Sequence, residues 1–497
     1  MESYNIRIYT ANVKKNIMKK EGQMTVYHLA VDIGASSGRH MIGWVEEEKI
    51  HLKEIYRFEN RLIRQNGHLC WDIDHLYEEV VQGIKACREQ GYEPETMGID
   101  TWAVDFVLID KDGKRLGDAV SYRDDRTDTI REELERKGIL SFEEHYSRTG
   151  IQYQKFNTCY QLLALKKEDP ELLDQADCLL MIPDYLNYRL TGRKAQEYTN
   201  ATTTGLVNAE TNTWDADLMR RLDIPLHIFA EISPAGTVLG DFSDEIQKET
   251  GMKVKVILPA THDTGSAYLA VPAKDENAVF LSSGTWSLLG VENRTAITTE
   301  ESCRENFTNE GGYEYRYRYL KNIMGLWMIQ NIRRELKDEN GNVPSFPELI
   351  KVAEEHKDFP SAVDPDDDRF LAPASMIEEV KKACADSGQR VPDSAGEVMQ
   401  TVYNSLSQDY RRAIDSLTAL TGKNYTTLHI VGGGSQDMYL NQMTANAAEL
   451  PVYAGPTEGT ALGNLIVQFI TEGEIETLQK AREIIGNSFE IREVKPQ

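Results

Sequence analysis

The chain has 497 residues, of which 40% are hydrophobic and 27% charged, and its formal net charge is −25 at pH 7. This length is too great for a single hydrophobic core and predicts two domains. The negative charge argues against a surface for nucleic acid or an anionic membrane, and no apolar run approaches the roughly 18 residues of a membrane span. The six cysteines are scattered without a Cys-x-x-Cys pair, which is typical of reduced thiols in a cytoplasmic protein.

Residues 1–23 differ from the rest of the chain, because they are basic and lack the apolar block of a signal peptide. An apolar strand begins directly after Met24. Codons for Lys20-Glu21-Gly22 can form a purine-rich ribosome-binding site, so we expect Met24 to be the natural start. Residues 1–23 are then a disordered or non-native extension, and the alternative is a genuine disordered arm.

The first predicted strand, residues 26–33, leads into a tight turn of small residues, Gly-Ala-Ser-Ser-Gly-Arg at 34–39, and a second strand follows at 40–45. Such a turn exposes N–H groups and hydroxyls that can hold phosphate oxygens, although it could also be a bare hairpin turn. It matches neither the G-x-x-x-x-G-K-[ST] loop nor a G-x-G-x-x-G that opens a helix. An acidic residue beside bound phosphate is placed to hold Mg²⁺ through water, which makes Asp32 the predicted metal residue.

A strand predicted at 97–100 ends beside an aromatic residue and two carboxylates, Asp100 and Asp105. The aromatic residue, Trp102, suits a sugar, since the sugar ring can stack on its face while carboxylates accept hydroxyl hydrogens. The alternative is a half-buried structural Trp.

Residues 261–265, Thr-His-Asp-Thr-Gly, follow a short apolar run at 254–260. A carboxylate at the end of a strand, beside a residue that can orient it, is what a general base needs, so Asp263 is the candidate and His262 its neighbour. Asp also favours the caps of helices, so Asp263 could begin the next helix. A helix N-terminus would then favour the ionised carboxylate.

The first hairpin has a partial copy later in the chain, because the order strand, Ser-Ser-Gly, strand, Val-Glu recurs with the same spacing at 36–46 and 282–292. This weak repeat predicts two domains whose hairpins face one nucleotide across a cleft, and chance similarity is the alternative. Three glycines at 432–434 join a strand, 427–431, to a helix and let a flat ring or a phosphate approach the backbone closely. Strands that alternate with helices indicate the α/β class.

An acidic loop covers residues 361–373, with aspartates at 364, 366, 367 and 368. Such a cluster suggests Ca²⁺, but the glycine and the final Glu of an EF-hand loop are missing. A long helix is predicted over 394–421, and Gly422 ends it.

Together these motifs resemble the carbohydrate-kinase family that includes the glycerol, xylulose and rhamnulose kinases, over essentially residues 26–469. The stretches that carry the resemblance are 32–39, 98–106, 198–204, 262–264, 281–288, 320–327 and 429–434. The resemblance implies two actin-like ATPase (ribonuclease H-like) domains that flank a cleft for nucleotide and sugar. Residues 24–267 would bind sugar and phosphate, and residues 268–497 would bind the nucleotide.

The resemblance also implies a role for each matching residue, with Asp263 as the catalytic base. The predicted sugar contacts are Trp102, Ala103, Asp105, His262, Asp263, Thr264 and Asn322. The predicted ATP contacts are Ala35, Ser36, Ser37, Gly38, Arg39, Thr285, Gln330 and Gly433. Position 103 departs from the family, since Gly is expected there. A second departure concerns cysteines: Cys384 has Tyr403 where a partner would stand, so no disulfide is expected.

The resemblance implies a cytoplasmic ATP:sugar phosphotransferase, using Mg²⁺, that converts L-rhamnulose to L-rhamnulose 1-phosphate in rhamnose catabolism. We expect a monomer or homodimer without nucleic-acid or membrane partners. One alternative is a kinase for another ketose, such as L-fuculose or xylulose. The other is a non-catalytic sensor of sugar or nucleotide on the same fold, which would be expected to lose Asp263 or one hairpin, and this chain keeps both.

Overall fold

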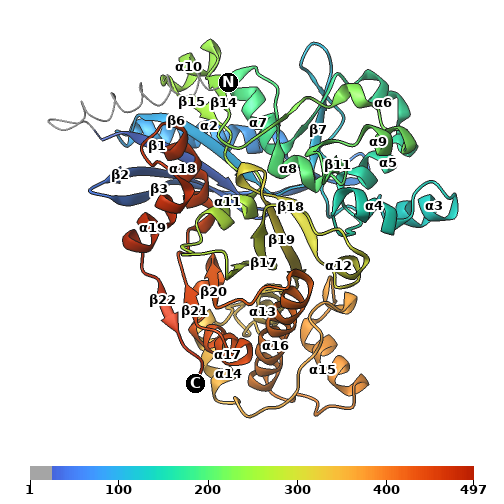
Figure 1. Ribbon diagram of the computed structural model, residues 1–497, viewed down its shortest axis with the longest axis vertical. Coiled ribbons are helices and arrows are strands. Elements are labelled where there is room, and N and C mark those ends of the chain that lie inside the picture. The colour runs from blue at the N-terminus through green and yellow to red at the C-terminus, as the bar shows by residue number, and fades with distance from the viewer. Residues whose placement is uncertain (1–24) are drawn as a thin grey trace.

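The computed structural model describes residues 25–497, so the predictions for residues 1–23 and for Met24 as the natural start lie outside the described residues. Two halves lie one above the other in Figure 1, and each is built on a large mixed sheet. The first sheet has six strands in the order β14-β15-β6-β1-β2-β3. These strands are β1 (Tyr27–Ile33), β2 (Ser37–Glu46), β3 (Lys49–Glu59), β6 (Pro94–Thr101), β14 (Val238–Asp241) and β15 (Lys255–Ile257).

The second sheet has seven strands in the order β18-β19-β17-β16-β20-β21-β22. They are β16 (Ala278–Ser283), β17 (Ser287–Asn293), β18 (Thr308–Gly311), β19 (Tyr317–Ile323), β20 (Thr427–Val431), β21 (Val452–Ala454) and β22 (Arg492–Val494). In each sheet the first strand forms an antiparallel hairpin with the second and also lies parallel to a strand from much later in the chain: β1 with β2 and β6, and β16 with β17 and β20. The fold is therefore α/β with two actin-like ATPase (ribonuclease H-like) domains, as predicted.

The Ser-Ser-Gly alignment that suggested this duplication is wrong in register. Ser37 is the first residue of β2, whereas Ser282 and Ser283 are the last residues of β16. The two turns correspond instead at Gly34 and Gly284, each of which follows directly on the end of the first strand.

One face of the first sheet packs on helices α2 (Ile73–Glu89), α7 (Ile182–Thr191) and α10 (Asp244–Thr250) through a continuous hydrophobic core. Helix α2 shows why the sequence folds this way, since Leu76, Val80, Ile84 and Cys87 recur at helical spacing and are all buried. The side chain of Asp72 caps this helix by accepting a hydrogen bond from the N–H of His75.

A smaller unit with its own core follows β6, on the sheet β8-β7-β9. Its strands are β7 (Phe106–Ile109), β8 (Arg115–Leu116) and β9 (Cys178–Met181), and its helices are α3 (Ile130–Arg136), α4 (Phe142–Thr149), α5 (Thr158–Glu168), α6 (Pro170–Gln175), α8 (Tyr198–Thr203) and α9 (Ala216–Arg221). Three short strand pairs complete the first half: β4 (Leu62–Gln65) with β5 (His68–Trp71), β10 (Gln196–Glu197) with β13 (Ile232–Ser233), and β11 (Val207–Asn208) with β12 (Thr213–Trp214).

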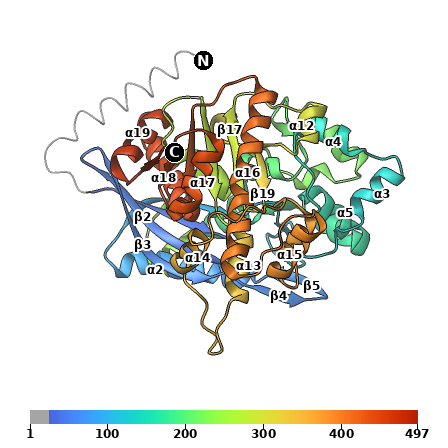
Figure 2. The same cartoon turned by 90° about the horizontal axis from the view of Figure 1, so that it is seen from below.

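Helices of the second half gather on its sheet around the long helix α16, as Figure 2 shows. They are α12 (Glu300–Arg304), α13 (Trp327–Glu335), α14 (Phe346–Glu354), α15 (Met376–Asp386), α16 (Ala395–Thr421) and α17 (Met438–Ala448). Ser394 and Glu397 form a capping box at the start of α16, and Gly422 ends it at a φ of 67°, so the prediction of a helix over 394–421 is confirmed.

The two halves meet where α11 (Asp263–Leu269) crosses α18 (Gly459–Thr471), and α19 (Leu478–Ser488) lies beside them against β3. The crossing is close, since a Cβ at Gly463 would stand 1.7 Å from the carbonyl oxygen of Ser266. Helix α18 also packs on β1 and β6, so part of the predicted second domain covers the first sheet. The boundary between residues 267 and 268 stays a prediction.

Two expectations from composition can be compared with the described residues. All six cysteines lie within residues 25–497 and are free thiols, so the expectation of no disulfide is confirmed. Within the same range, no helix combines the length and the apolar character that crossing a membrane would need.

Candidate active site

A cavity of about 500 Å³ lies between the two halves, and both hairpin turns reach it. Most of the predicted site residues share its wall: Ala35, Ser36, Ser37, Arg39, Trp102, Ala103, His262, Asp263, Thr264, Thr285, Asn322 and Gly433. Four predicted residues lie outside this lining: Asp32, Gly38, Asp105 and Gln330. The structure therefore brings most of the predicted sugar and ATP contacts to one place.

The first hairpin turn is held in shape by backbone contacts. The N–H of Gly34 donates to the carbonyl of Ser37 at 2.9 Å, and the Asn60 side chain donates to the carbonyl of Gly34 at 3.0 Å. Gly38 has a packing role, since a Cβ there would stand 2.1 Å from the Phe58 ring. The turn thus presents its backbone at 34–37 to the cavity while Gly38 lets β2 sit against β3.

The second hairpin turn rests on the triple glycine. A Cβ at Gly434 would stand 1.9 Å from the Ser283 hydroxyl, and Gly432 has a φ of 86°, a conformation that favours glycine. The start of α13 is tied to the same turn, because the N–H of Trp327 donates to the carbonyl of Thr285 at 3.0 Å. The glycines therefore serve first to pack this turn, and Gly432 and Gly433 also line the cavity.

Carboxylates gather where the central strands of the first sheet end. Asp32 on β1 lies opposite Asp100 on β6 in a parallel register. Asp100 is fully buried: one oxygen accepts from the Asn464 side chain at 2.6 Å, and the other, Oδ1, has no hydrogen-bond partner. Burial, followed by the charge of Asp32, raises the pKa of Asp100 well above its ordinary value.

Arg39 is the cation beside these carboxylates. Its Nε and Nη2 donate to Asp32 Oδ2 at 3.0 and 2.8 Å, and Nη1 pairs with Glu458. Asp100 has a buried carboxylate oxygen without a hydrogen-bond partner, and Asp32 lies next to it. Hard divalent cations prefer carboxylate oxygens as ligands, so these two residues fit Mg²⁺.

Asp263 reaches the cavity because the end of β6 holds the segment before it. The N–H of Thr101 donates to the carbonyl of Thr261 at 2.9 Å, and Thr101 forms an isolated bridge with His262. Asp263 is the first residue of α11, so the cap position belongs to His262, and Asp263 Oδ1 accepts from the N–H of Thr264 at 2.5 Å. The Asp263 side chain is 29% exposed.

Burial is the largest influence on the Asp263 carboxyl, and the charge of Asp32 adds to it, so its pKa rises to about 7. These two influences outweigh the helix N-terminus, which was expected to favour the ionised form. A helix of seven residues offers little dipole, whereas a neighbouring carboxylate acts at full charge. A pKa near 7 suits a group that must both accept and release a proton at neutral pH.

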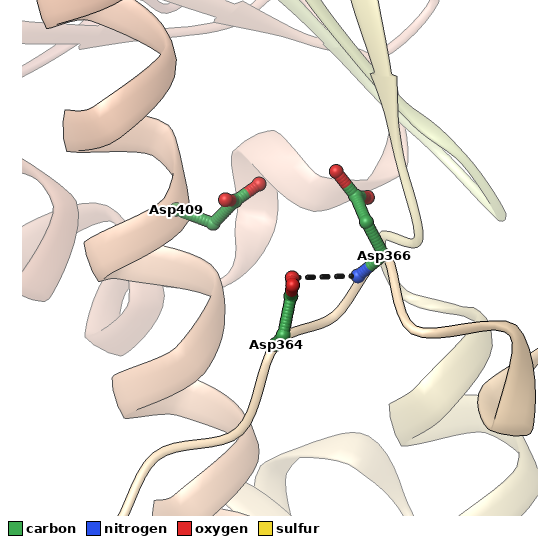
Figure 3. Close-up of side chains that lie close together, drawn as sticks. All are labelled: Asp364, Asp366 and Asp409. Carbon is green, nitrogen blue, oxygen red and sulfur yellow. Dashed lines mark hydrogen bonds between the residues drawn. The ribbon is translucent and has the colours of Figure 1, made fainter. Parts of the chain in front are cut away.

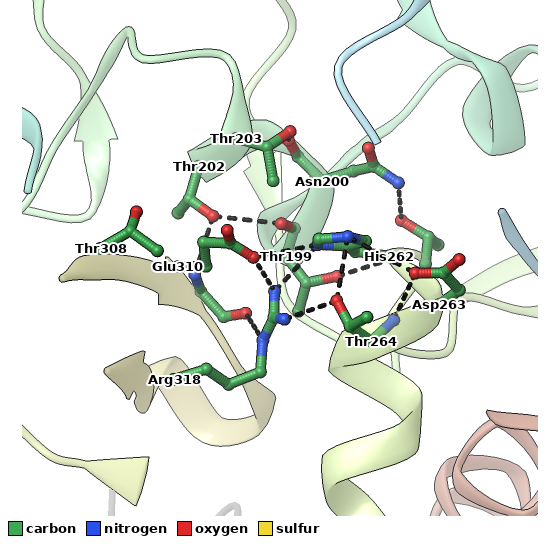
Figure 4. A network of polar contacts seen from close by, with 12 residues as sticks. Thr199, Asn200, Thr202, Thr203, His262, Asp263, Thr264, Thr308, Glu310 and Arg318 are labelled. Atoms are coloured by element: carbon green, nitrogen blue, oxygen red, sulfur yellow. Dashed lines mark hydrogen bonds and ion pairs between the residues drawn. The ribbon is translucent and has the colours of Figure 1, made fainter. Parts of the chain in front are cut away.

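Arg318 organises the side chains next to Asp263, as Figure 4 shows. Its guanidinium is fully buried and donates to Thr264 Oγ1 at 2.8 Å, to His262 Nδ1 at 2.9 Å and to the carbonyl of Gly311 at 2.9 Å. It also pairs with Glu310 at 3.1 Å. Three rigid contacts from one planar group fix the orientation of both His262 and Thr264.

The Arg318 contacts set the proton positions in this network. His262 Nδ1 accepts from Arg318, so the ring proton lies on Nε2, which is 3.0 Å from Thr264 Oγ1 and 3.5 Å from Asp263 Oδ1. Burial and the Arg318 charge hold the pKa of His262 well below its ordinary value, so the imidazole is neutral. Thr264 Oγ1 accepts from Arg318, which leaves its own hydroxyl hydrogen free to donate.

A second buried carboxylate anchors the backbone of this segment. Glu197 Oε2 accepts from the N–H and the hydroxyl of Thr261, at 3.1 and 2.8 Å, and from the N–H of Thr199 at 3.0 Å. The Thr199 hydroxyl in turn accepts from the N–H of His262 at 3.1 Å. Glu197 thus joins the start of α8 to the residues just before Asp263.

The predicted aromatic wall has a different construction from the expected one. Trp102 packs against Trp71, with ring centroids 4.1 Å apart, and both indole N–H groups donate to Asp105 Oδ2, at 3.0 and 2.6 Å. Asp105 is 1% exposed and also accepts from Gln161 and from the N–H of Tyr122. The structure therefore places Asp105 behind the wall as its support, away from any ligand in the cavity.

Several residues around the cavity were not predicted from the sequence. Arg318 and Glu310 lie opposite each other on β19 and β18, and because both strands also carry other polar residues, no local sequence pattern distinguishes this pair. Five further lining residues are not among the predicted site residues: Tyr122, Arg123, Gln152, Asn157 and Thr203. Gln330 was predicted to contact ATP, and it lies on α13 outside the cavity lining.

Comparison with known proteins gives a consistent result. The sequence matches the FGGY family of carbohydrate kinases, with the N-terminal domain over residues 27–270 and the C-terminal domain over 279–472. It is 51% identical over 464 residues to a rhamnulokinase of Oceanobacillus iheyensis, covering 93% of this chain and 97% of that protein. It is 42% identical over 471 residues to a rhamnulokinase of Bacillus subtilis, covering 95% of each.

Solved structures resemble the fold at low sequence identity. A gluconate kinase from Lactobacillus acidophilus superposes with a TM-score of 0.78 at 17% identity, covering 95% of this chain and 94% of that one. A glycerol kinase from Plasmodium falciparum with ADP gives a TM-score of 0.74 at 17% identity, covering 96% of each chain.

Proposed function

The chain belongs to the FGGY family of carbohydrate kinases and is a sugar phosphotransferase, and we propose that it transfers the γ-phosphate of ATP to the 1-hydroxyl of L-rhamnulose. The products are L-rhamnulose 1-phosphate and ADP. The choice of sugar is supported by similarity to rhamnulokinases along 93–95% of the chain. The free cysteines are consistent with the cytoplasm as the site of action.

One observation carries the proposal: Asp263, both hairpin turns and the Trp102 wall line the same cavity. Phosphoryl transfer needs little covalent chemistry from the protein, so catalysis depends on position and charge. A cavity that is lined by both backbone turns, a base and an aromatic wall supplies both.

Asp263 is the proposed general base. Its carboxylate takes the proton of the 1-hydroxyl as the sugar oxygen forms a bond to the γ-phosphorus, and the bond from that phosphorus to the bridging oxygen of ADP breaks. Neutral His262 directs its Nε2 proton to Thr264 Oγ1, and the free hydroxyl hydrogen of Thr264 acts as a donor to a sugar oxygen. Arg318 fixes both donors before the sugar binds.

Charge on the phosphates would be offset by the backbone of both turns and by the Arg39 guanidinium. Asp32 and Asp100 would hold Mg²⁺, which when bound supplies positive charge to the phosphate oxygens of ATP. Loss of a single preorganised donor of this kind typically costs about 10²–10³ in rate.

The test is a coupled ADP-release assay with L-rhamnulose, L-fuculose and D-xylulose, with a control that lacks sugar. We expect L-rhamnulose to give the highest kcat/KM, and the ³¹P spectrum of the product to show coupling to two protons of one methylene carbon. A higher kcat/KM for another ketose would overturn the assignment of L-rhamnulose as the substrate. Equal ADP release with and without sugar would overturn sugar phosphorylation by this cavity.

A further inference from the structure

A second group of carboxylates lies outside the catalytic cavity. Asp364 and Asp366 come from the loop before the short 3-10 helix Asp368–Phe370, and Asp409 comes from α16. One carboxylate oxygen from each of the three lies within 4.8 Å of the others. Figure 3 shows the three side chains converging on one space between the loop and the helix.

Asp409 provides a second, independent sign of a ligand. The residue is 1% exposed, and its Oδ1 accepts from Arg412 at 2.8 Å. Its other oxygen, Oδ2, is buried without any hydrogen-bond partner among the described residues. Figure 3 shows this carboxylate directed toward Asp366. A buried charged oxygen without a partner is costly, so an ion or ordered water at this position would satisfy it.

The charges around this space do not cancel. Lys321 pairs with Asp366 at 3.2 Å, and Arg412 pairs with Asp409. Asp364 accepts a hydrogen bond from the N–H of Asp366 at 3.1 Å. Three carboxylates thus face two cationic side chains, which leaves one negative charge to be compensated.

There is room for an ion and its waters. A cavity of about 420 Å³ adjoins the three carboxylates, and Val363 and Gln408 also line it. Lys321 and Asn322 are neighbours on β19 but line different cavities, Lys321 this one and Asn322 the catalytic one.

We propose that Asp364, Asp366 and Asp409 bind a divalent metal cation of the size of Ca²⁺, at a site separate from the ATP and sugar cavity. Ca²⁺ takes oxygen ligands at about 2.3–2.6 Å, so two ligands on opposite sides of the ion stand about 4.6–5.2 Å apart. Carboxylate oxygens that lie within 4.8 Å of one another can therefore reach one such ion together. Mg²⁺ needs about 2.0–2.1 Å in near-ideal octahedral geometry, which an irregular loop and a helix supply less readily.

Ion binding would join the loop at 361–373 to α16, so it should stabilise the second half of the protein. The experiment uses the full chain, stripped with a chelator and free of ATP, and titrates it with CaCl₂ and, separately, MgCl₂ by calorimetry. Thermal unfolding with and without each salt gives an independent readout that does not involve activity.

Two variants and one control locate the site. Asp409→Asn and Asp364→Asn each remove a ligand charge while keeping the side-chain shape. Asp367→Asn is the matched control, because Asp367 lies in the same loop but pairs with Arg369 at 3.0 Å. We expect one equivalent of Ca²⁺ to bind wild type and Asp367→Asn alike, with affinity at least tenfold weaker in the other two variants.

Absence of Ca²⁺ binding up to about 10⁻³ M, the weak end of protein calcium sites, would overturn the proposal. So would equal Ca²⁺ affinity in Asp364→Asn, an exposed position where the substitution leaves the fold intact and which therefore decides the question if Asp409→Asn does not fold. Mg²⁺ binding as tight as Ca²⁺ binding would overturn the proposal that the site selects an ion of the size of Ca²⁺.

Discussion

The two hairpins occupy equivalent places in the two sheets but carry different chemistry. In the first, Asp32 lies opposite Asp100 at the ends of parallel strands, and Arg39 stands beside them. In the second, the corresponding pair near the strand ends is Ser282 and Val431, without a charge. Duplication thus gives the cavity two backbone turns, whereas the first half alone supplies the carboxylates at the strand ends.

This difference shows which parts of the site each half supplies. The first half brings Asp263 and the carboxylates that tune it, and the second half contributes Arg318 and Glu310, which orient the neighbours of Asp263. Changes to the first hairpin should therefore affect the chemical step, and matched changes to the second should not.

The largest effect is expected for Asp263→Asn. The amide cannot accept the proton of the sugar hydroxyl, so sugar phosphorylation should fall by about 10²–10⁴ while the protein folds and binds ATP. Steady-state ADP release and nucleotide titration measure the two properties separately. More than about a tenth of wild-type activity in this variant would contradict the base assignment.

Asp32→Asn should lower kcat by about 10², because the phosphates lose the carboxylate that would hold Mg²⁺ beside them. Ser282→Ala is the matched change in the second hairpin and should stay within a few-fold of wild type, since no charge is removed. Similar losses of kcat in both variants, measured in the same assay, would contradict the proposed difference between the two hairpins.

Arg318→Met should reduce kcat/KM by up to about 10², because His262 and Thr264 lose the group that orients them. A purely structural role predicts lower stability alone, so ¹⁵N-histidine spectra provide the second readout. We expect His262 to lose its preference for the Nε2-protonated form. An unchanged tautomer together with unchanged kcat/KM would show that Arg318 does not position the site.

The smallest effect is expected in the aromatic wall. Trp102→Phe removes one donor to buried Asp105 and should raise the KM for sugar about 2- to 10-fold, with kcat less affected. Trp71→Phe removes the other donor from a residue outside the cavity lining, so it should lower the melting temperature with little change in KM. The reverse pattern would place the sugar contact elsewhere.

Much of the fold could be predicted from the sequence, because local patterns specify it. Strand 27–33, helix 395–421 and strand 427–431 follow from apolar periodicity and from caps such as Ser394 and Gly422. The register of the repeat could not be predicted, since Ser-Ser-Gly occurs on opposite sides of the two turns. Local similarity does not reveal which residue ends a strand.

The site was most readily predicted where residues lie next to a strand end. Asp263 and Trp102 meet that condition, and the cavity brings them together. Arg318 lies inside a strand, and its importance depends on contacts with residues 54 and 56 positions earlier in the chain. Asp105 shows the opposite case: its position beside Trp102 indicated a ligand contact, but its hydrogen bonds all point into the protein.

The most direct test of the account is the pH dependence of kcat/KM for wild type and Asp32→Asn, measured with ATP and L-rhamnulose well below their KM values. Under these conditions the acid limb reports the free enzyme, and only ionised Asp263 can act as the base. For wild type we predict a tenfold fall per pH unit below a midpoint near pH 7. Removing the Asp32 charge favours ionised Asp263, so the midpoint should move to lower pH in the variant. A midpoint that stays in place or moves upward, or a wild-type profile that stays flat below pH 7, would contradict the central claim.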